Sequence, residues 1–215
     1  MGRSARKLLM SGGRAPFEAP TYVDRVDQPA GSTLTWPGGI QSGDLAYLAA
    51  FSFVDNETSY PQYNNPSGFT FLSSGQFAPS GSKYTTGHSY KICTGSESGT
   101  FTKPITAGTK RNVLIILRPS IGYSFSSIIN ESRAYSPSSI TSIVSSANYP
   151  VITLGSQFET SNTSSWSPTP DGDSWDVTGD MHFHWLHYAT GDTDTDSVLN
   201  GSSNTPKTIA QFAYS

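Results

Sequence analysis

The sequence is poor in charged residues, in cysteine and in long apolar runs. Only 13% of its 215 residues are Asp, Glu, Lys or Arg, about half the usual share for a soluble domain. The single cysteine, Cys93, excludes an intrachain disulfide, which small extracellular domains usually need. No segment approaches the roughly 18 apolar residues of a membrane helix, and Leu8-Leu9-Met10 is too short for a signal-peptide core. The sequence therefore predicts no membrane span, no Sec export, and assembly in a reducing cytoplasm.

Small polar and aromatic residues take the place of charge. The chain has 35 Ser and 23 Thr beside 20 Gly and 14 Pro, a composition that disfavours helical bundles and α/β enzymes. Low-complexity chains of this kind are often disordered, but they lack aromatic residues. Here 12% of the residues are Phe, Tyr or Trp, enough to form a core. The composition predicts a compact all-β protein with long polar loops.

Period-2 runs separated by turn signals recur from residue 21 onward, and they predict about ten strands. We expect an antiparallel two-sheet β-sandwich of the jelly-roll type, formed by one domain at 21–215 that follows an extended basic arm at 1–20. Glu159–Val177 is expected to be a loop and Ser136–Ser146 to contain a single helical turn. The expected strands are Thr21–Asp27, Ser32–Trp36, Asp44–Val54, Phe69–Leu72, Tyr84–Ile92, Gly99–Lys103, Asn112–Arg118, Gly122–Ile129, Pro150–Leu154, Asp180–Ala189 and Lys207–Tyr214.

Two of these runs predict the core. Alternate residues of Asp44–Val54 are large and apolar, so they should share one buried face. Asn112–Arg118 is apolar on both faces, which is typical of a central strand covered on both sides. The side chains expected to be buried are Leu45, Tyr47, Phe51, Phe53, Leu114 and Ile116.

The arm has a different charge from the rest of the chain. It carries four cations, Arg3, Arg6, Lys7 and Arg14, and beyond residue 20 there are 9 Lys and Arg against 15 Asp and Glu. An acidic body argues against nucleic-acid binding. Because the arm has few apolar side chains to offset the entropy of its ordering, we expect it to lie on an acidic protein partner.

Neither of two metal-like patterns is complete. His182 and His184 share a face of a strand, as in a cupin metal site, but no Glu follows them. Asp192, Asp194 and Asp196 resemble the start of a calcium loop, but the expected Gly and Glu are replaced by Ser197 and Ser203. We therefore expect no metal and no cofactor. A metal-dependent enzyme with a cupin-like fold is kept as an alternative function.

Nucleophile patterns are also weak. A Gly-x-Ser-x-Gly elbow is absent from the sequence. Cys93 and His88 are five residues apart on one strand, which places them on opposite faces. A glycosidase would be expected to carry Glu residues in an aromatic-rich strand, and none of the five Glu residues lies in one. These observations predict a protein that is not an enzyme.

Four segments occur in order along the first half of the chain: Gly43–Phe51, Pro66–Thr70, Tyr90–Thr102 and Leu114–Pro119. Together they resemble a jelly-roll module found in structural proteins of tailed bacteriophages. In that family a strand opens with Gly-Asp-Leu, a Pro-x-Gly-Trp turn follows, then a Tyr-Lys…Glu-Ser-Gly-Thr strand pair and an apolar strand that ends in Arg-Pro or Arg-Gly. This chain has Phe69 in place of the Trp.

The resemblance implies a non-enzymatic virion structural protein, made in the cytoplasm of a host bacterium. A capsid decoration, or cement, protein is the more specific expectation, because the chain has a compact body, a basic arm and no fibre-like repeat. Its expected partner is the major capsid protein or another virion protein, contacted through Arg3, Arg6, Lys7 and Arg14. A dimer or trimer is expected, since symmetric shells present symmetric sites.

Two alternatives remain open. The chain could be a tail or fibre component, or a carbohydrate-binding jelly-roll module that contacts glycans on the host surface. Trp166 and Trp175 lie in polar stretches and could stack on sugars or contact another subunit. Tyr60 and Tyr63 are further candidates for such stacking.

Overall fold

The fold contains strands and no helix in the part of the chain that the computed structural model describes. No helix capable of crossing a membrane occurs among these residues. The described residues are 20–28, 31–55, 59–78, 82–134, 139–143, 151–158, 165–167, 175–177, 181–188, 196–200 and 207–214.

The first half of the chain forms one antiparallel sheet, called here the first sheet. Its strand order is β1-β7-β3-β5-β4, so the predicted central strand β7 does lie between two neighbours. Register is continuous along β3 and β5 from Leu45 opposite Ile92 to Asp55 opposite Ser82. The strands are β1 (Thr21–Asp27), β3 (Ser42–Asp55), β4 (Thr70–Phe77), β5 (Ser82–Thr94) and β7 (Thr109–Arg118).

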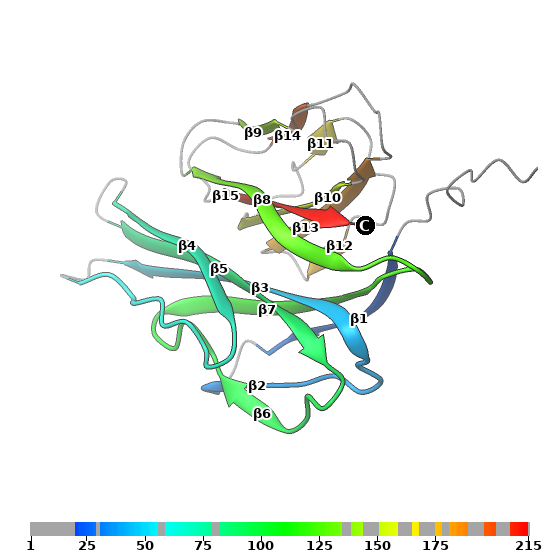
Figure 1. Ribbon diagram of the computed structural model, residues 1–215. Helices are drawn as coiled ribbons and strands as arrows, with labels where there is room; N and C mark the ends of the chain where they lie inside the picture. The colour runs from blue at the N-terminus through cyan, green and yellow to red at the C-terminus, as the bar shows by residue number, and fades with distance from the viewer. Residues whose placement is uncertain are drawn as a thin grey trace, which may run out of the picture.

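The second half forms a second antiparallel sheet, which packs against the first (Figure 1). Its order is β12-β13-β10-β15-β8. Both β13 and β15 pair with β10 over seven or more positions. The strands are β8 (Phe125–Ala134), β10 (Val151–Phe158), β12 (Trp175–Val177), β13 (Met181–Tyr188) and β15 (Lys207–Tyr214).

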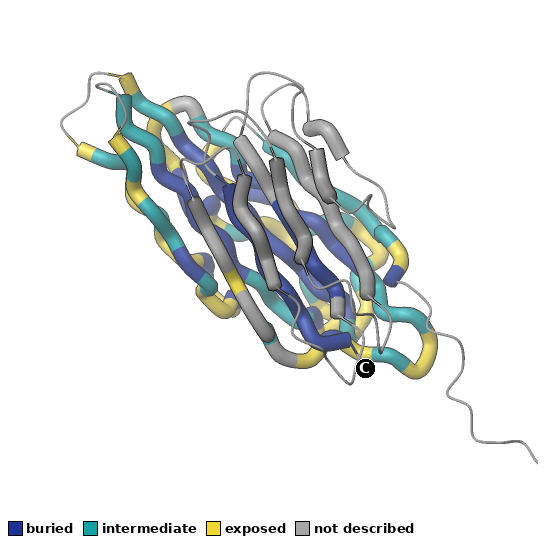
Figure 2. Tube along the Cα trace, turned by 90° about the horizontal axis from the view of Figure 1, so that it is seen from above, coloured by how far each residue is buried: buried dark blue, intermediate teal, exposed yellow. Residues whose placement is uncertain are grey.

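The main core lies between these two sheets. Alternate residues of β3, including Tyr47 and Phe51, point into it, together with Ile115 of β7 and Phe212 of β15. Buried positions follow the middle of the strands, and exposed positions gather at their ends (Figure 2). The predicted phase of β3 is confirmed: Leu45, Tyr47 and Phe51 are buried, and Phe53 packs at the margin of the core.

A second, smaller core lies on the outer face of the first sheet. Leu114 and Ile116 of β7 point into it, as predicted for a strand covered on both sides. A two-stranded ribbon of β2 (Thr33–Thr35) and β6 (Thr100–Thr102) covers this face (Figure 1). Phe69 belongs to this layer, where its ring stacks on Trp36 at 5.6 Å, and it therefore does not close the end of the main core.

Three short strands form a third sheet beside the second. The order is β11-β14-β9, and β9 lies close to β8 and β15. These are β9 (Ser139–Ile143), β11 (Ser165–Ser167) and β14 (Asp196–Asn200). The helical turn expected near Ser136–Ser146 is wrong, because residues 139–143 pair with β14 as a strand. The loop expected at Glu159–Val177 likewise contains β11 and β12.

The chain fills the two main sheets one after the other. Strands before residue 119 form the first sheet and its ribbon, and strands after residue 124 form the second and third sheets. A jelly roll, built from two Greek keys, instead passes between its two sheets along the chain. The all-β class and the antiparallel packing of two sheets are thus observed, whereas jelly-roll connectivity is not confirmed.

Candidate functional site

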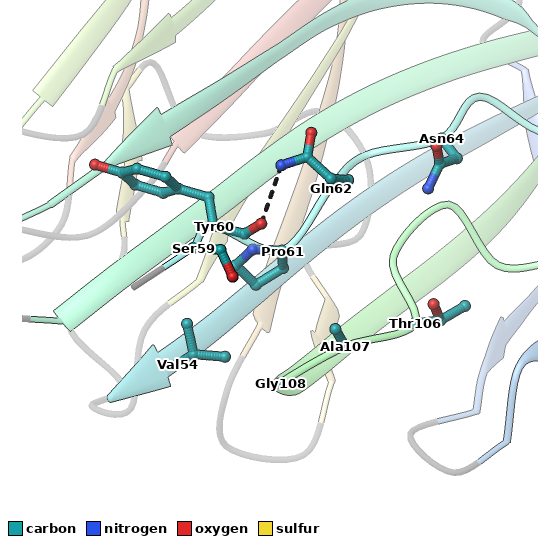
Figure 3. A pocket seen from close by; sticks show the side chains of 9 residues that line it. All are labelled: Val54, Ser59, Tyr60, Pro61, Gln62, Asn64, Thr106, Ala107 and Gly108. Carbon is teal, nitrogen blue, oxygen red and sulfur yellow. Dashed lines mark hydrogen bonds between the residues drawn. The ribbon is translucent and has the colours of Figure 1, made fainter. Parts of the chain in front are cut away.

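A pocket lies at the end of the first sheet, where the segment after β3 meets the segment before β7 (Figure 3). Its volume of about 400 Å³ falls within the range of about 300–1,000 Å³ that is usual for ligand sites. The lining residues are Val54, Ser59, Tyr60, Pro61, Gln62, Asn64, Thr106, Ala107 and Gly108.

The wall formed by residues 59–64 is fixed to β5. Thr85 Oγ1 donates a hydrogen bond of 2.6 Å to the Pro61 carbonyl oxygen, and the Tyr63 hydroxyl donates one of 2.9 Å to Ser89 Oγ. Tyr63 packs so closely on Gly87 that a Cβ at Gly87 would lie 2.3 Å from the ring. Burial raises the pKa of Tyr63. Tyr63 is therefore a structural anchor, and its ring is not available for stacking on a ligand.

The opposite wall, residues 104–108, is fixed to β3 and β7. The Asn112 amide accepts from the Ile105 N–H at 3.2 Å and donates to the Ile105 carbonyl oxygen at 3.1 Å. Ser52 Oγ donates to the Ala107 carbonyl oxygen at 2.6 Å. Gly108 has φ +75°, and a Cβ there would lie 2.6 Å from the Phe53 carbonyl oxygen, so glycine is required.

The two walls are also joined to each other. The Asn64 N–H donates a hydrogen bond of 2.8 Å to the Pro104 carbonyl oxygen. Both walls are thus held on one rigid sheet, and the pocket is formed before any ligand arrives.

The described residues that line this pocket carry no charged side chain. Their polar groups are two amides, Gln62 and Asn64, and the hydroxyls of Ser59, Tyr60 and Thr106. Gln62 Nε2 donates to the Tyr60 carbonyl oxygen at 3.0 Å (Figure 3).

Two lysines among the described residues stand at the rim of the pocket. Lys83 Nζ lies 4.4 Å from the centre of the Tyr60 ring, and Lys110 Nζ donates to the Thr106 carbonyl oxygen at 2.7 Å. The chemistry therefore suits a neutral, hydrogen-bonding ligand.

A separate polar network crosses the main core between the two sheets. His88 is fully buried, and its Nδ1 lies 2.8 Å from the Tyr47 hydroxyl. Its Nε2 lies 2.7 Å from Ser73 Oγ and 3.2 Å from Glu131 Oε2. Ser73 Oγ in turn donates to Glu131 Oε2 at 2.7 Å. The Tyr47 hydroxyl also lies 3.4 Å from Thr208 Oγ1 of the second sheet.

This network contains the residue types of a catalytic triad but not its arrangement. In a triad the nucleophile and the acid contact opposite nitrogens of the imidazole. Here Ser73 and Glu131 both lie at Nε2 of His88, and Ser73 is buried. The arrangement instead satisfies polar groups within the core and links the two sheets.

Cys93 is equally unsuited to nucleophilic chemistry. It lies in the second core, on the face of β5 opposite to His88, as the sequence predicted. Burial is the largest cause that raises the pKa of its thiol, to about 12, and the neighbouring Glu97 and Asp44 carboxylates add to it. The reactive thiolate is therefore scarce at neutral pH.

The residues that carry the phage-module resemblance form structural contacts. Asp44, from the Gly-Asp-Leu motif, meets Arg118, from the Arg-Pro motif, in a two-pronged ion pair at 3.0 and 2.8 Å. Lys91 and Glu97, from the Tyr-Lys and Glu-Ser-Gly motifs, pair at 2.9 Å. Gly68 closes the Pro66–Phe69 turn with φ +81°. These motifs hold strands and turns in place.

Residues 1–19 of the predicted arm lie outside the described residues, so Arg3, Arg6, Lys7 and Arg14 are not placed. Trp166 and Trp175 lie in β11 and β12, rather than in loops. Their backbones pair with Leu199 and Phe183 respectively. These two tryptophans therefore belong to two different sheets.

The metal-like patterns fall mostly outside the described side chains. His182 and His184 occupy alternate positions of β13, opposite Gln157 and Gly155 of β10. Asp196 begins β14, and Asp192 and Asp194 lie outside the described residues. The residues that the structure describes contain no group of three His, Cys, Asp or Glu that could hold a metal ion.

Sequence reasoning singled out Tyr60 as a stacking candidate but missed the rest of the pocket. Asn64 and Thr106 come from segments about forty residues apart, and neither carries a motif. The only local signals are the turn residues around Gly108 and the Pro61–Pro66 stretch.

No family model matches the chain, and no match was found among curated proteins or solved structures.

Proposed function

We propose that this chain is a non-enzymatic structural protein of a tailed-bacteriophage virion, with capsid decoration as its specific role. The supporting observation is the contact between Asp44 and Arg118, which joins the first and last motifs of the resemblance. The matched motifs lie within residues 40–120. Their residues belong to the first sheet, to the β2–β6 ribbon and to the turns between strands, and their contacts stabilise the fold. The proposal does not require jelly-roll connectivity.

The chemistry of the described residues supports a scaffold rather than an enzyme. Ser73 and Glu131 both lie at Nε2 of His88, which is not the arrangement of a triad, and burial raises the pKa of the Cys93 thiol. The ion pairs between Asp44 and Arg118 and between Lys91 and Glu97 hold the fold together.

Particles purified from the source test the assignment directly. Mass spectrometry of the purified particles should detect the chain at many copies per particle, and immunogold labelling should place it on the head. Labelling on the tail would support the alternative of a tail or fibre component. Absence of the chain from purified particles would overturn the proposal.

The basic arm is the proposed attachment segment. Replacement of Arg3, Arg6, Lys7 and Arg14 by Gln should weaken binding to undecorated particles, and rising salt should weaken binding of the natural chain. A matched variant with the three arginines changed to Lys retains the charge and should bind nearly normally. Equal binding by the Gln variant would assign attachment to another surface.

A carbohydrate-binding role is the second candidate, and the pocket at Tyr60 is the observation that favours it. Trp166 and Trp175, in β11 and β12, are the other residues proposed for glycan or subunit contact.

A further inference from the structure

We propose that the pocket between residues 59–64 and 104–108 is a binding site for a neutral saccharide. This site goes beyond attachment to a virion and does not depend on it. The argument rests on the charge, the hydrogen-bonding capacity and the rigidity of the lining residues.

The lining offers hydrogen bonds without charge. Asn64 and Thr106 are both exposed, and their side-chain polar groups make no hydrogen bond to the residues that the structure describes. Gln62 uses its Nε2 on the Tyr60 carbonyl oxygen, which leaves its Oε1 as an acceptor. Amides and hydroxyls of this kind pair with sugar hydroxyls, which both donate and accept.

Tyr60 supplies the aromatic contact. It is one of the lining residues, and its ring lies at the margin of the pocket farthest from Asn64, where it points away from Thr106 and Ala107 (Figure 3). Lys83 stands over the ring at 4.4 Å, an interaction that fixes the orientation of the ring. Val54, Pro61 and Ala107 add carbon surface, so the site can contact the apolar faces of a sugar ring as well as its hydroxyls.

Other ligand classes fit this lining less well. A phosphate or a carboxylate is bound most strongly by a cationic side chain, and the described residues of the lining include none. The nearby Lys110 ammonium is bound to the Thr106 carbonyl oxygen. A lipid chain would need a lining without amides and hydroxyls.

The rigidity of the site favours recognition. Each wall is tied to the first sheet by side-chain hydrogen bonds to its carbonyl oxygens, from Thr85 to Pro61 and from Ser52 to Ala107. Little ordering is therefore needed when a ligand binds, which reduces the entropic cost of association.

The test uses the full-length chain and a panel of hexasaccharides. The neutral probes are β-1,4-linked glucose, N-acetylglucosamine and mannose oligomers, and the acidic probe is an oligogalacturonate. We expect calorimetry to detect binding of at least one neutral probe and weaker or no binding of the acidic one. Asn64→Ala and Thr106→Val should each weaken that binding about 3- to 10-fold, because each removes a neutral hydrogen bond.

Further variants complete the design. Tyr60→Ala should weaken binding about 10-fold, whereas Tyr60→Phe should retain the stacking surface. Gln76→Ala, an exposed amide on β4, is the matched control and should bind normally. Because Asn64 and Thr106 are exposed, unchanged melting curves should accompany the loss of affinity in Asn64→Ala and Thr106→Val.

Several results would overturn the inference. They are the absence of binding to every neutral probe, a preference for the acidic probe, and full binding by Asn64→Ala and Thr106→Val. Binding lost only in Trp166→Ala or Trp175→Ala would place the glycan site elsewhere. None of these results depends on whether the chain is found in virions, so the two proposals fail separately.

Discussion

Phe51 contributes strongly to the stability of the main core. It is fully buried between the sheets, so Phe51→Ala removes a ring that the surrounding side chains cannot replace. We expect a loss of about 3–5 kcal/mol in the free energy of unfolding, measured by denaturant titration. Phe71→Ala is the control, because Phe71 is 48% exposed and should change that free energy by about 0.5 kcal/mol or less. Similar losses for the two variants would contradict the assignment of the core.

Asp44 and Arg118 form an ion pair whose contribution to the free energy of unfolding depends on its geometry. The Asp44 carboxylate is fully buried and also accepts from the Gln41 N–H at 2.8 Å. Asp44→Asn removes the negative charge that the guanidinium contacts, and we expect unfolding experiments to show a loss of about 2–3 kcal/mol. The pKa of Arg118 is raised by its hydrogen bonds to Asp44, so the arginine stays charged.

Arg118→Lys tests the geometry separately. It retains the charge but cannot form both prongs of the pair, and it should lose part of the same free energy. If Asp44→Asn were as stable as the natural chain, the pair would contribute nothing to the fold.

Two tyrosines show what a sequence cannot reveal at the scale of a residue. Tyr60 and Tyr63 are three positions apart in the same polar stretch, and both are candidates for contact with a sugar. In the fold, Tyr63 packs on Gly87 and bonds to Ser89, while Tyr60 lines the pocket. Tyr63 can pack on β5 because Gly87 has no side chain at that point.

At the scale of elements, the alternation of apolar and polar residues predicted those strands that bury one face in the core. Asp44–Val54 and Asn112–Arg118 were located within a few residues, and their buried faces were correct. The helical turn expected near Ser136–Ser146 is a strand at residues 139–143, although the spacing of Ile140 and Ile143 is locally compatible with one face of a helix. The strand exists because it pairs with β14, more than fifty residues later, and such pairing leaves no local pattern.

The turn between β5 and β6 predicts a pH dependence. Burial pushes the pKa of Glu97 upward, but hydrogen bonds from the Thr94 backbone, from Lys91 and from further donors outweigh it and lower the pKa to about 2. A lowered carboxylate pKa stabilises the fold above the unfolded-state value of about 4.5, and this stability is lost as pH falls towards 2. Because the hydrogen bonds to Glu97 are exposed to solvent, screening limits the contribution to about 1 kcal/mol.

Glu97→Gln should remove this contribution. We expect its free energy of unfolding to be lower than that of the natural chain near pH 6 and the difference to shrink towards pH 2. Denaturant titrations of both proteins at several pH values measure the difference, so that other carboxylates cancel. A difference that stays constant with pH would show that the Glu97 carboxylate has an ordinary pKa in the fold.

At the scale of the whole molecule, the chain builds two sheets in succession and hides their facing surfaces in one core. The network from Ser73 and His88 to Glu131 and Thr208 spans both sheets, and the pocket combines two segments of the first half. The sequence predicted the two layers from composition and alternation. It could not predict these sites, because each depends on the register between distant strands.

A shared core also predicts that neither half folds alone. The sheets are joined by an exposed turn, where Ile121 is 100% exposed and Gly122 has φ +85°. A chain cut in this turn, into residues 1–120 and 121–215, leaves Tyr47, Phe51 and Ile115 of the first sheet without their cover. Each fragment should therefore lack a cooperative thermal transition and dispersed amide resonances, whereas an equimolar mixture should recover both. A control cut in a loop within one half would not separate the two sheets. A dispersed spectrum and a sharp transition for fragment 1–120 alone would show that the first sheet is stable without the second, and that the two halves are independent folding units.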